Sequence, residues 1–265
     1  MQTSTYKDMM GRWVAIPHSP KRIISLVPSQ TELLFDLGLD EEVVGITKFC
    51  EHPNAWRKQK TIVGGTKKVD FSIIDQLAPD LIIANKEENT KEMIAALEAK
   101  HPVWISDVTT KIENELMIEQ IGALVQRPQQ ALIIISKIQQ AFSKLKCLSS
   151  DLKVAYFIWK DPWMVAASNT FIHEMLLENE WSNVFEHKER YPIISIDELI
   201  EANPEVIFLS SEPYPFKDKH IEELALQLPN TKIILVDGTY FSWYGSRMQN
   251  ATAYFEELHQ QLYYG

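Results

Sequence analysis

The sequence lacks most of the features that mark secreted, membrane-spanning or nucleic-acid-binding proteins. It contains only two cysteines, Cys50 and Cys147, so a disulfide framework is not indicated. No run of about 18 apolar residues is present to span a membrane, and the N-terminus lacks the apolar core and cleavage site of a signal peptide. The formal net charge of -10, without a dense basic stripe, argues against a nucleic-acid partner. From these features alone we expect a cytoplasmic location.

The signature motifs of common enzymes are also missing. The chain has no G-x-S-x-G, H-E-x-x-H or G-x-x-x-x-G-K-[ST] motif and no paired C-x-x-C. Cys50, Glu51 and His52 are three possible metal ligands in succession, but adjacent residues do not converge on one ion without partners elsewhere. A single axial ligand to a metal already held in a macrocycle is easier to supply, and His52 or Tyr244 could provide it. We therefore expect no catalytic residues and no metal site built by the protein alone.

What the sequence does contain is an internal repeat. It reads SIIDQLAPDLIIA from Ser72 and SIDELIEANPEVIFL from Ser195, and in both places an amphipathic helix and a Pro-Asp or Pro-Glu turn precede an apolar strand. Each half opens with a strand-like segment, KRIISLV or LKVAYFIW, and closes with another, VWISD or IILVD. A repeat with a period above about 100 residues predicts two similar lobes and not a solenoid.

Strands alternate with helices in both halves, which predicts α/β lobes with parallel sheets and right-handed crossovers. Ser29 and Glu32 have the spacing of a capping box for the first helix. From Pro128 to Leu148 apolar residues recur at helical spacing, so we expect either a stiff connector between the lobes or an ordinary crossover helix. The predicted division is an N-terminal hairpin at residues 1–20, a first lobe at 21–127, the connecting helix at 128–148 and a second lobe at 149–265.

Candidate binding residues lie in the loops after the strands, where open α/β sheets bind their ligands. In the second lobe these loops are rich in aromatic residues, which suit a large, flat and partly apolar ligand. Some of them, such as Phe216 and Phe241, could instead pack beneath the loops as a local core. Arg247 is expected either to clamp a polar ligand edge or to form an ion pair at a helix N-terminus. His220 and His259 are expected on the surface.

The chain resembles the helical-backbone substrate-binding proteins of ABC importers for cobalamin, haem and iron-siderophores. The resemblance rests on the ordered runs PKRIISLVPSQTELLFDLGL, VVGITKFCEHP, QLAPDLIIA, WKDPWMVAASNTFIHEMLLE, YPIISIDEL and SWYGSR, and it is closest to the cobalamin-binding branch. It implies a periplasmic-binding-protein-like fold, with two Rossmann-like lobes joined by one long rigid helix and a metal chelate in the cleft between the lobes. It also implies a periplasmic monomer that has no covalently bound cofactor and works with a permease and an ATPase.

The loops and the resemblance together select the candidate site residues. Asn85 stands where cobalamin binders tend to have an aromatic residue, and the charged Glu87 follows it. The resemblance assigns docking on the permease to one acidic residue in each lobe, Glu92 and Glu222, although Lys91 occupies the aligned position in the first lobe. The predicted ligand-binding residues are Phe49, Cys50, His52, Gly65, Thr66, Asn85, Glu87, Trp159, Trp163, Tyr214, Tyr240, Trp243, Tyr244 and Arg247.

The function that the resemblance implies is the capture of a cobalamin, haem or iron-siderophore chelate by the substrate-binding component of an ABC importer, without enzymatic activity. The alternative is a cytoplasmic chelatase-like enzyme that inserts metal into a tetrapyrrole, with His52 or Glu87 as base, or a ligand sensor without a transporter. Incubation with a tetrapyrrole and a divalent metal distinguishes these classes, because a binder changes the absorption spectrum only stoichiometrically.

Overall fold

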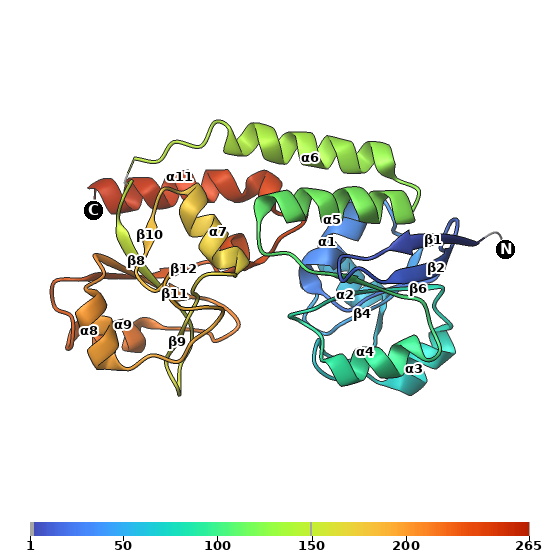
Figure 1. Ribbon diagram of the computed structural model, residues 1–265, viewed down its shortest axis with the longest axis horizontal. Helices are drawn as coiled ribbons and strands as arrows, with labels where there is room; N and C mark the ends of the chain where they lie inside the picture. The colour runs from blue at the N-terminus through green and yellow to red at the C-terminus, as the bar shows by residue number, and fades with distance from the viewer. Residues whose placement is uncertain (1–2, 149, 265) are drawn as a thin grey trace. The chain divides into compact units, whose positions relative to one another are not determined.

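Strands that alternate with helices build a sheet in each of two compact units, which confirms the α/β prediction (Figure 1). The computed structural model describes residues 3–148 and 150–264. No helix within those residues is long and apolar enough to cross a membrane. Unit 1 consists of the chain up to Val108, Ile112–Gln139 and Tyr244–Gln249, and unit 2 consists of Thr109–Lys111, Gln140–Trp243 and the chain from Asn250 onward.

The sheet of unit 1 has the strand order β5-β4-β3-β6-β7, and every neighbouring pair is parallel. Its strands are β3 (Ile23–Ser25), β4 (Val43–Ile46), β5 (Thr61–Ile62), β6 (Leu81–Asn85) and β7 (Val103–Ser106). All residues of β3 and β6 are buried, which explains why these central strands read as continuous apolar runs. The chain extends the sheet from β3 through β4 to β5 and then returns to the other side of β3. The loops after β3 and β6 therefore flank the point where the strand order reverses.

Helices connect these strands, and their ends follow local chemistry. They are α1 (Pro28–Asp36), α2 (Asn54–Gln59), α3 (Phe71–Leu77) and α4 (Lys91–Glu98). α3 begins after Asp70, whose carboxylate accepts the backbone N–H of Ser72 at 2.9 Å. The capping box predicted for α1 is wrong, because that helix begins at Pro28 and its N-cap Val27 makes no side-chain bond. The fixed φ of proline suits the first turn, so Ser29 lies inside the helix and is buried.

A separate antiparallel hairpin precedes the first sheet, as the sequence predicts. It consists of β1 (Thr3–Lys7) and β2 (Trp13–Pro17). Its turn is closed by Arg12, whose Nε donates to Asp8 Oδ2 at 2.8 Å. The turn lies against the edge strand β7, where the Met9 N–H donates to the Ile105 carbonyl at 3.1 Å. The hairpin therefore covers part of an edge that would otherwise present unpaired backbone groups.

The sheet of unit 2 has the strand order β10-β8-β11-β12, with parallel pairing throughout that path. Its strands are β8 (Lys153–Trp159), β9 (Met164–Val165), β10 (Ser182–Asn183), β11 (Val206–Ser210) and β12 (Lys232–Val236). The order reverses between β8 and β11, so the loops after these strands flank the second switch point. The prediction of purely parallel sheets is wrong for β9, which pairs antiparallel with β8. The loop between β8 and β9 is too short for the crossover that parallel pairing needs.

The helices of unit 2 start at side-chain caps where the sequence provides them. They are α7 (Phe171–Glu178), α8 (Ile196–Ala202), α9 (Asp218–Ala225), α10 (Thr239–Ser242) and most of α11 (Met248–Tyr264). α8 has a complete capping box, in which Ser195 accepts the Glu198 N–H and Glu198 accepts the Ser195 N–H. The second copy of the repeat therefore begins its helix at the serine that opens the repeat.

Two further helices lie side by side in Figure 1, namely α5 (Lys111–Leu124) and α6 (Pro128–Phe142). α5 was not predicted. α6 begins at the predicted proline but ends at Phe142 instead of Leu148, because beyond Phe142 the backbone bonds span only three residues. The two helices approach closely, since a Cβ on Gly122 would lie 2.4 Å from Ala131 Cβ. The chain passes from unit 1 to unit 2 within α6, after Gln139.

Candidate ligand-binding site

The candidate residues lie in loops at the carboxyl ends of the strands in both units. Parallel strands run in one direction, so within each sheet these loops share one edge. In unit 1 they follow β4, β5 and β6, and in unit 2 they follow β8, β11 and β12. The two edges differ in chemistry, and each has its own contacts.

In unit 1 the turn after β4 exposes Phe49 and buries Cys50. The Phe49 ring is 51% exposed, and the Lys48 ammonium lies 5.0 Å from its centre in cation–π geometry. Gly65 lies beneath the ring, because a Cβ there would be 3.1 Å from Phe49 Cε2. Cys50 Sγ lies 3.0 Å from Thr31 Oγ1, and burial raises the pKa of the thiol. Phe49 is thus open to a ligand, whereas Cys50 packs inside the unit.

The loop after β6 is held in shape by two asparagines. Asn85 Nδ2 donates to Ser106 Oγ at 3.0 Å, and Asn85 Oδ1 accepts the backbone N–H of Glu87 at 2.8 Å. Asn89 Nδ2 donates to the Thr66 carbonyl at 2.8 Å, which joins this loop to the turn after β5. Asn85 is only 1% exposed. Its side-chain nitrogen bonds to β7 and its side-chain oxygen bonds to the loop. Asn85 was predicted to contact the ligand, but it supports the loop instead.

The segment Tyr244–Gln249 packs in unit 1 and buries a predicted ligand residue. Tyr244 is 7% exposed, and its phenol lies close to the side chains of Ser29 and Ser106. Burial raises the pKa of this phenol well above its usual range. The structure therefore does not present Tyr244 as an axial ligand. The other candidate for that role, His52, is half-buried in the loop after β4.

Arg247 forms the ion pair that was one of its two predicted alternatives. Its Nε donates to Glu32 Oε2 at 2.9 Å and its Nη2 to Glu32 Oε1 at 3.1 Å, directly before α11 begins. Burial raises the pKa of Glu32, and the opposing effects of Arg247 and His52 only partly offset it. The guanidinium is thus engaged within unit 1 by a two-pronged carboxylate contact.

In unit 2 four aromatic side chains form a continuous cluster after β8 and β11. Trp163 stacks parallel to Phe216, with 6.1 Å between ring centres and 2° between planes. The centre of the Tyr214 ring lies 4.8 Å from that of Phe216 and 5.5 Å from that of Trp159. Trp159 is 40% exposed. Phe216 is buried, so one of the predicted aromatic residues packs beneath the loop while the others remain accessible. Lys160 lies 4.8 Å from the centre of the Trp163 ring.

A second group of unit 2 lies after β11 and β12. Tyr240 stacks on Tyr254 with 4.5 Å between ring centres and 15° between planes. Trp243 is buried, and its Nε1 donates to Glu212 Oε1 at 2.7 Å. Ser242 Oγ donates to the same oxygen at 2.8 Å. Trp243 therefore supports a carboxylate, whereas Tyr240 is only partly covered.

His220 and His259 are buried, so the prediction that they lie on the surface is wrong. His220 Nδ1 accepts the Lys217 N–H at 2.9 Å, and its ring packs on the aromatic cluster. His259 Nε2 lies 3.1 Å from Asn179 Oδ1, and burial lowers the pKa of its imidazole to about 4. Each histidine lies on the inner side of an amphipathic helix, where the neutral imidazole finds a partner.

The sequence profile described as "Periplasmic binding protein" matches residues 23–228 of the chain. The chain belongs to the periplasmic binding protein family. The match covers most of the chain, and it confirms the family that the ordered sequence runs indicate.

Several known proteins are similar to this periplasmic binding protein. An uncharacterized ABC transporter substrate-binding lipoprotein of Bacillus subtilis is 26% identical, over 77% of this chain and 68% of that protein. A vitamin B12-binding protein of Photorhabdus laumondii is also 26% identical, over 92% of this chain and 88% of that protein. A periplasmic haem-binding protein of Roseiflexus has the same fold, with a TM-score of 0.78, 21% identity and coverage of 92% and 98%.

Two charged residues at the candidate edge of unit 2 of this periplasmic binding protein are absent from the predicted ligand set. Glu212 occupies the loop after β11, and Lys160 follows β8 directly, where it pairs with Glu223 and lies over Trp163. Their positions after strands were a usable signal. Aromatic residues nearby drew the prediction, because a charged residue in a loop usually indicates only a solvated surface.

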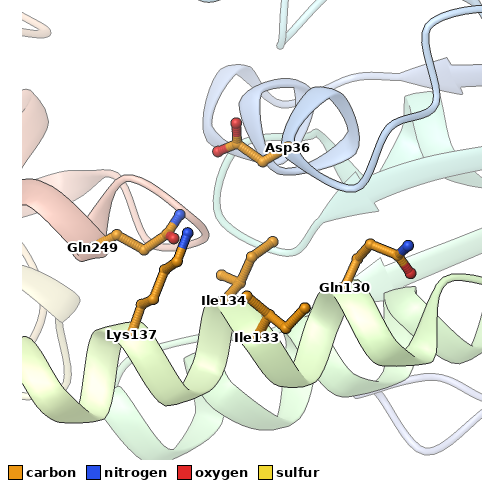
Figure 2. Close-up of a pocket in the computed structure, with 6 residues that line it drawn as sticks. All are labelled: Asp36, Gln130, Ile133, Ile134, Lys137 and Gln249. Atoms are coloured by element: carbon orange, nitrogen blue, oxygen red, sulfur yellow. The ribbon is translucent and has the colours of Figure 1, made fainter.

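Figure 2 shows a hollow in unit 1 that is lined by helices and not by these loops. Its volume is about 160 Å³, and Lys137 and Asp36 place opposite charges on its wall. Pockets for drug-sized ligands usually enclose about 300–1,000 Å³, so this hollow is too small for a metal chelate of the predicted kind. The lining residues are Asp36, Gln130, Ile133, Ile134, Lys137 and Gln249.

Proposed function

We propose that this periplasmic binding protein is the substrate-binding component of an ABC importer and captures a cobalamin, haem or iron-siderophore type of chelate. The observation that carries the proposal is the accessible aromatic surface of unit 2, at the loops of its switch point. Contact with such rings removes the apolar faces of a flat chelate from water, which contributes about 25 cal/mol per Å². The functions for which the relatives are named, vitamin B12 binding and haem binding, support the same class of ligand.

Each unit supplies a different kind of contact in this proposal. Unit 2 contributes the faces and edges of aromatic rings, and unit 1 contributes one exposed ring beside polar groups. Cys50, Asn85, Tyr244 and Arg247 hold the loops in place and are not part of the contact surface. Gly65 and Thr66 are buried beneath Phe49 and in the turn after β5, so they support the surface. The residues that we propose to touch the ligand are Phe49, His52, Glu87, Trp159, Trp163, Tyr214 and Tyr240.

Transfer of the ligand across a membrane would require a permease and an ATPase. We propose that Glu92 on α4 and Glu222 on α9 make the contacts with the permease, because both side chains are exposed on helices. The name of the Bacillus subtilis relative, an ABC transporter substrate-binding lipoprotein, supports a partnership with a transporter. Charge reversal of both residues is expected to abolish stimulation of the transporter's ATPase without changing ligand affinity.

A binding panel tests the proposal directly. The purified chain is mixed with cyanocobalamin, haemin or a ferric siderophore, and thermal unfolding and tryptophan fluorescence are recorded. A ligand present at about 100 times its Kd should stabilise the folded protein by about 2.7 kcal/mol, which appears as a raised Tm. If no chelate of these three classes changes either signal, the proposal is wrong.

Paired variants locate the binding surface. The double variant Trp163→Ala and Tyr240→Ala should weaken the chelate found in the panel at least about tenfold, since aromatic anchors dominate such contacts. Trp13→Ala is the matched control, because Trp13 is 70% exposed on the N-terminal hairpin. Equal affinity of the double variant and the control would refute the proposed contact surface.

The chelatase alternative is not favoured by membership of the periplasmic binding protein family. Within residues 3–148 and 150–264 no group of three or more His, Cys, Asp or Glu side chains is placed to hold a metal ion. Incubation with sirohydrochlorin and a divalent metal, followed by absorption spectroscopy, tests this alternative. Multiple turnovers would assign the chain to the chelatase class.

A further inference from the structure

The carboxylate of Glu212 is held in one orientation at the aromatic edge of unit 2. Its Oε1 accepts two neutral donors, Ser242 Oγ at 2.8 Å and Trp243 Nε1 at 2.7 Å. The Glu212 side chain is itself only half-buried. Two donors on one oxygen fix the plane of the carboxylate without neutralising its charge.

The backbone beneath Glu212 is fixed as well. Ser210 Oγ donates to the Glu212 carbonyl at 2.6 Å, and the buried Tyr156 hydroxyl hydrogen-bonds with Ser210 Oγ at 3.1 Å. Gly238 leaves the room that this arrangement needs. A Cβ at that position would lie 2.2 Å from Ser210 Oγ and 2.9 Å from Glu212 Cγ. The end of β11, the end of α10 and the glycine before α10 thus all fix the position of one acidic side chain.

The surroundings determine what such a carboxylate recognises. It lies in the same loop as Tyr214, and its donor Trp243 follows α10, which carries Tyr240. A carboxylate accepts hydrogen bonds and donates none, and its bonds to N–H groups are stronger than neutral ones. A second anion in the same place would be repelled, at a cost that grows as a ligand displaces water.

We propose that Glu212 is a specificity-determining residue, and that it selects chelates whose edge carries N–H donors, such as primary amides, while it rejects chelates with anionic edges. This inference rests on the proposed function and narrows it to amide-bearing corrinoid ligands. Aromatic rings alone would accept any flat chelate of suitable size. The oriented carboxylate adds the repulsive element that specificity between similar ligands requires.

The test compares one amide-rich probe with one anionic probe. Cyanocobalamin carries primary amides around its ring, and haemin carries two carboxylates. Dissociation constants of the full chain for both probes are measured by tryptophan fluorescence, for the unchanged protein and for Glu212→Gln. We expect Glu212→Gln to weaken cyanocobalamin about tenfold and to leave haemin binding equal or tighter, because a charge-assisted bond becomes a neutral one. Glu212→Asp retains the charge and should keep the preference for cyanocobalamin.

The control is Glu201→Gln, which removes one negative charge from the exposed side of α8 in the same unit. It should change neither constant. If Glu212→Gln only disturbs the fold, both probes bind more weakly and the Tm falls. In that case Ser242→Ala replaces it in the test, because this variant removes one orienting donor while Glu212 keeps its charge. An unchanged ratio of the two constants in Glu212→Gln or in Ser242→Ala overturns the inference and leaves the proposed function intact. Failure of the unchanged protein to bind any chelate overturns both.

Discussion

The two units share a parallel-sheet plan, but the loops after their strands differ in chemistry. In unit 1 the loop after β6 is closed by asparagine and serine side chains that bond to the backbone. In unit 2 the loops after β8 and β11 are closed by rings that pack on rings. Two similar sheets can therefore present different contact surfaces, because the loops after the strands vary while the strands stay buried.

The difference has a physical consequence for ligand contact. Asparagine side chains that satisfy backbone groups have no spare capacity for a ligand, and their loop is fixed in advance. Aromatic rings pack on one another without hydrogen bonds to the backbone, and their exposed faces remain available for a ligand. We therefore expect unit 1 substitutions to alter stability and unit 2 substitutions to alter ligand affinity.

The largest effect is expected at Asn85. Asn85→Ala removes hydrogen bonds to Ser106 and to the backbone of Glu87, and it leaves buried polar groups unpaired. The free energy of unfolding should fall by about 2–4 kcal/mol, measured by urea denaturation. Asn85→Asp keeps the acceptor and should cost less. A loss of ligand affinity without a loss of stability would show that Asn85 contacts the ligand. That result would contradict the expected division, in which unit 1 substitutions alter stability and unit 2 substitutions alter affinity.

The second prediction concerns pH and lies in the core of unit 2. Above about pH 6.5 His259 is neutral in both states, but the folded pKa of about 4 lies below the unfolded value of 6.5. As the pH falls from 6.5 to 4, the unfolded chain gains a proton that the folded chain does not. The free energy of unfolding should therefore fall by up to about 3 kcal/mol in that window.

Urea denaturation at several pH values measures this loss. His259→Gln should remove that part of the pH dependence, because glutamine can still bond to Asn179 without titrating. The exposed His187 provides the control, since His187→Gln should leave the slope unchanged. An identical slope in all three proteins would contradict the assignment to His259.

The smallest effects separate two cations, one in each unit. Arg247→Met removes a two-pronged contact and leaves half-buried Glu32 without it, which should cost about 1–2 kcal/mol in urea denaturation. Lys160→Met removes an ion pair with the exposed Glu223, which should cost less than about 1 kcal/mol. Equal costs for the two variants would mean that the tighter geometry of the unit 1 pair adds nothing.

Much of the fold was legible in local patterns. The repeat from Ser72 and Ser195 predicted two alike units, and strand-helix alternation predicted their parallel sheets. Pro128 marked the start of α6 correctly. These predictions worked because apolar periodicity, proline and caps act within a few residues along the chain. The strand β9 and the helix α5 escaped prediction, since neither carries a strong local signal.

The roles of site residues depended on partners that are distant in sequence. Arg247 could have been a ligand clamp until Glu32, on α1, was seen to accept both of its donors. The sequence predicts Tyr244 as an available phenol, but Ser29 and Ser106 lie close to it in the folded unit. The prediction that His220 and His259 are exposed fails because the sequence does not reveal which face of each helix packs against the rest of the unit.

Sequence pattern was thus sufficient for the family, the duplicated plan and the aromatic character of the second half, because each is written in contiguous residues. Long-range packing decided which loop residues face outward and which support them. Phe49 and Cys50 are neighbours in the chain, yet the Phe49 side chain is exposed and the Cys50 side chain is fully buried. That outcome depends on Gly65 and Thr31, whose positions follow from how the strands and helices assemble.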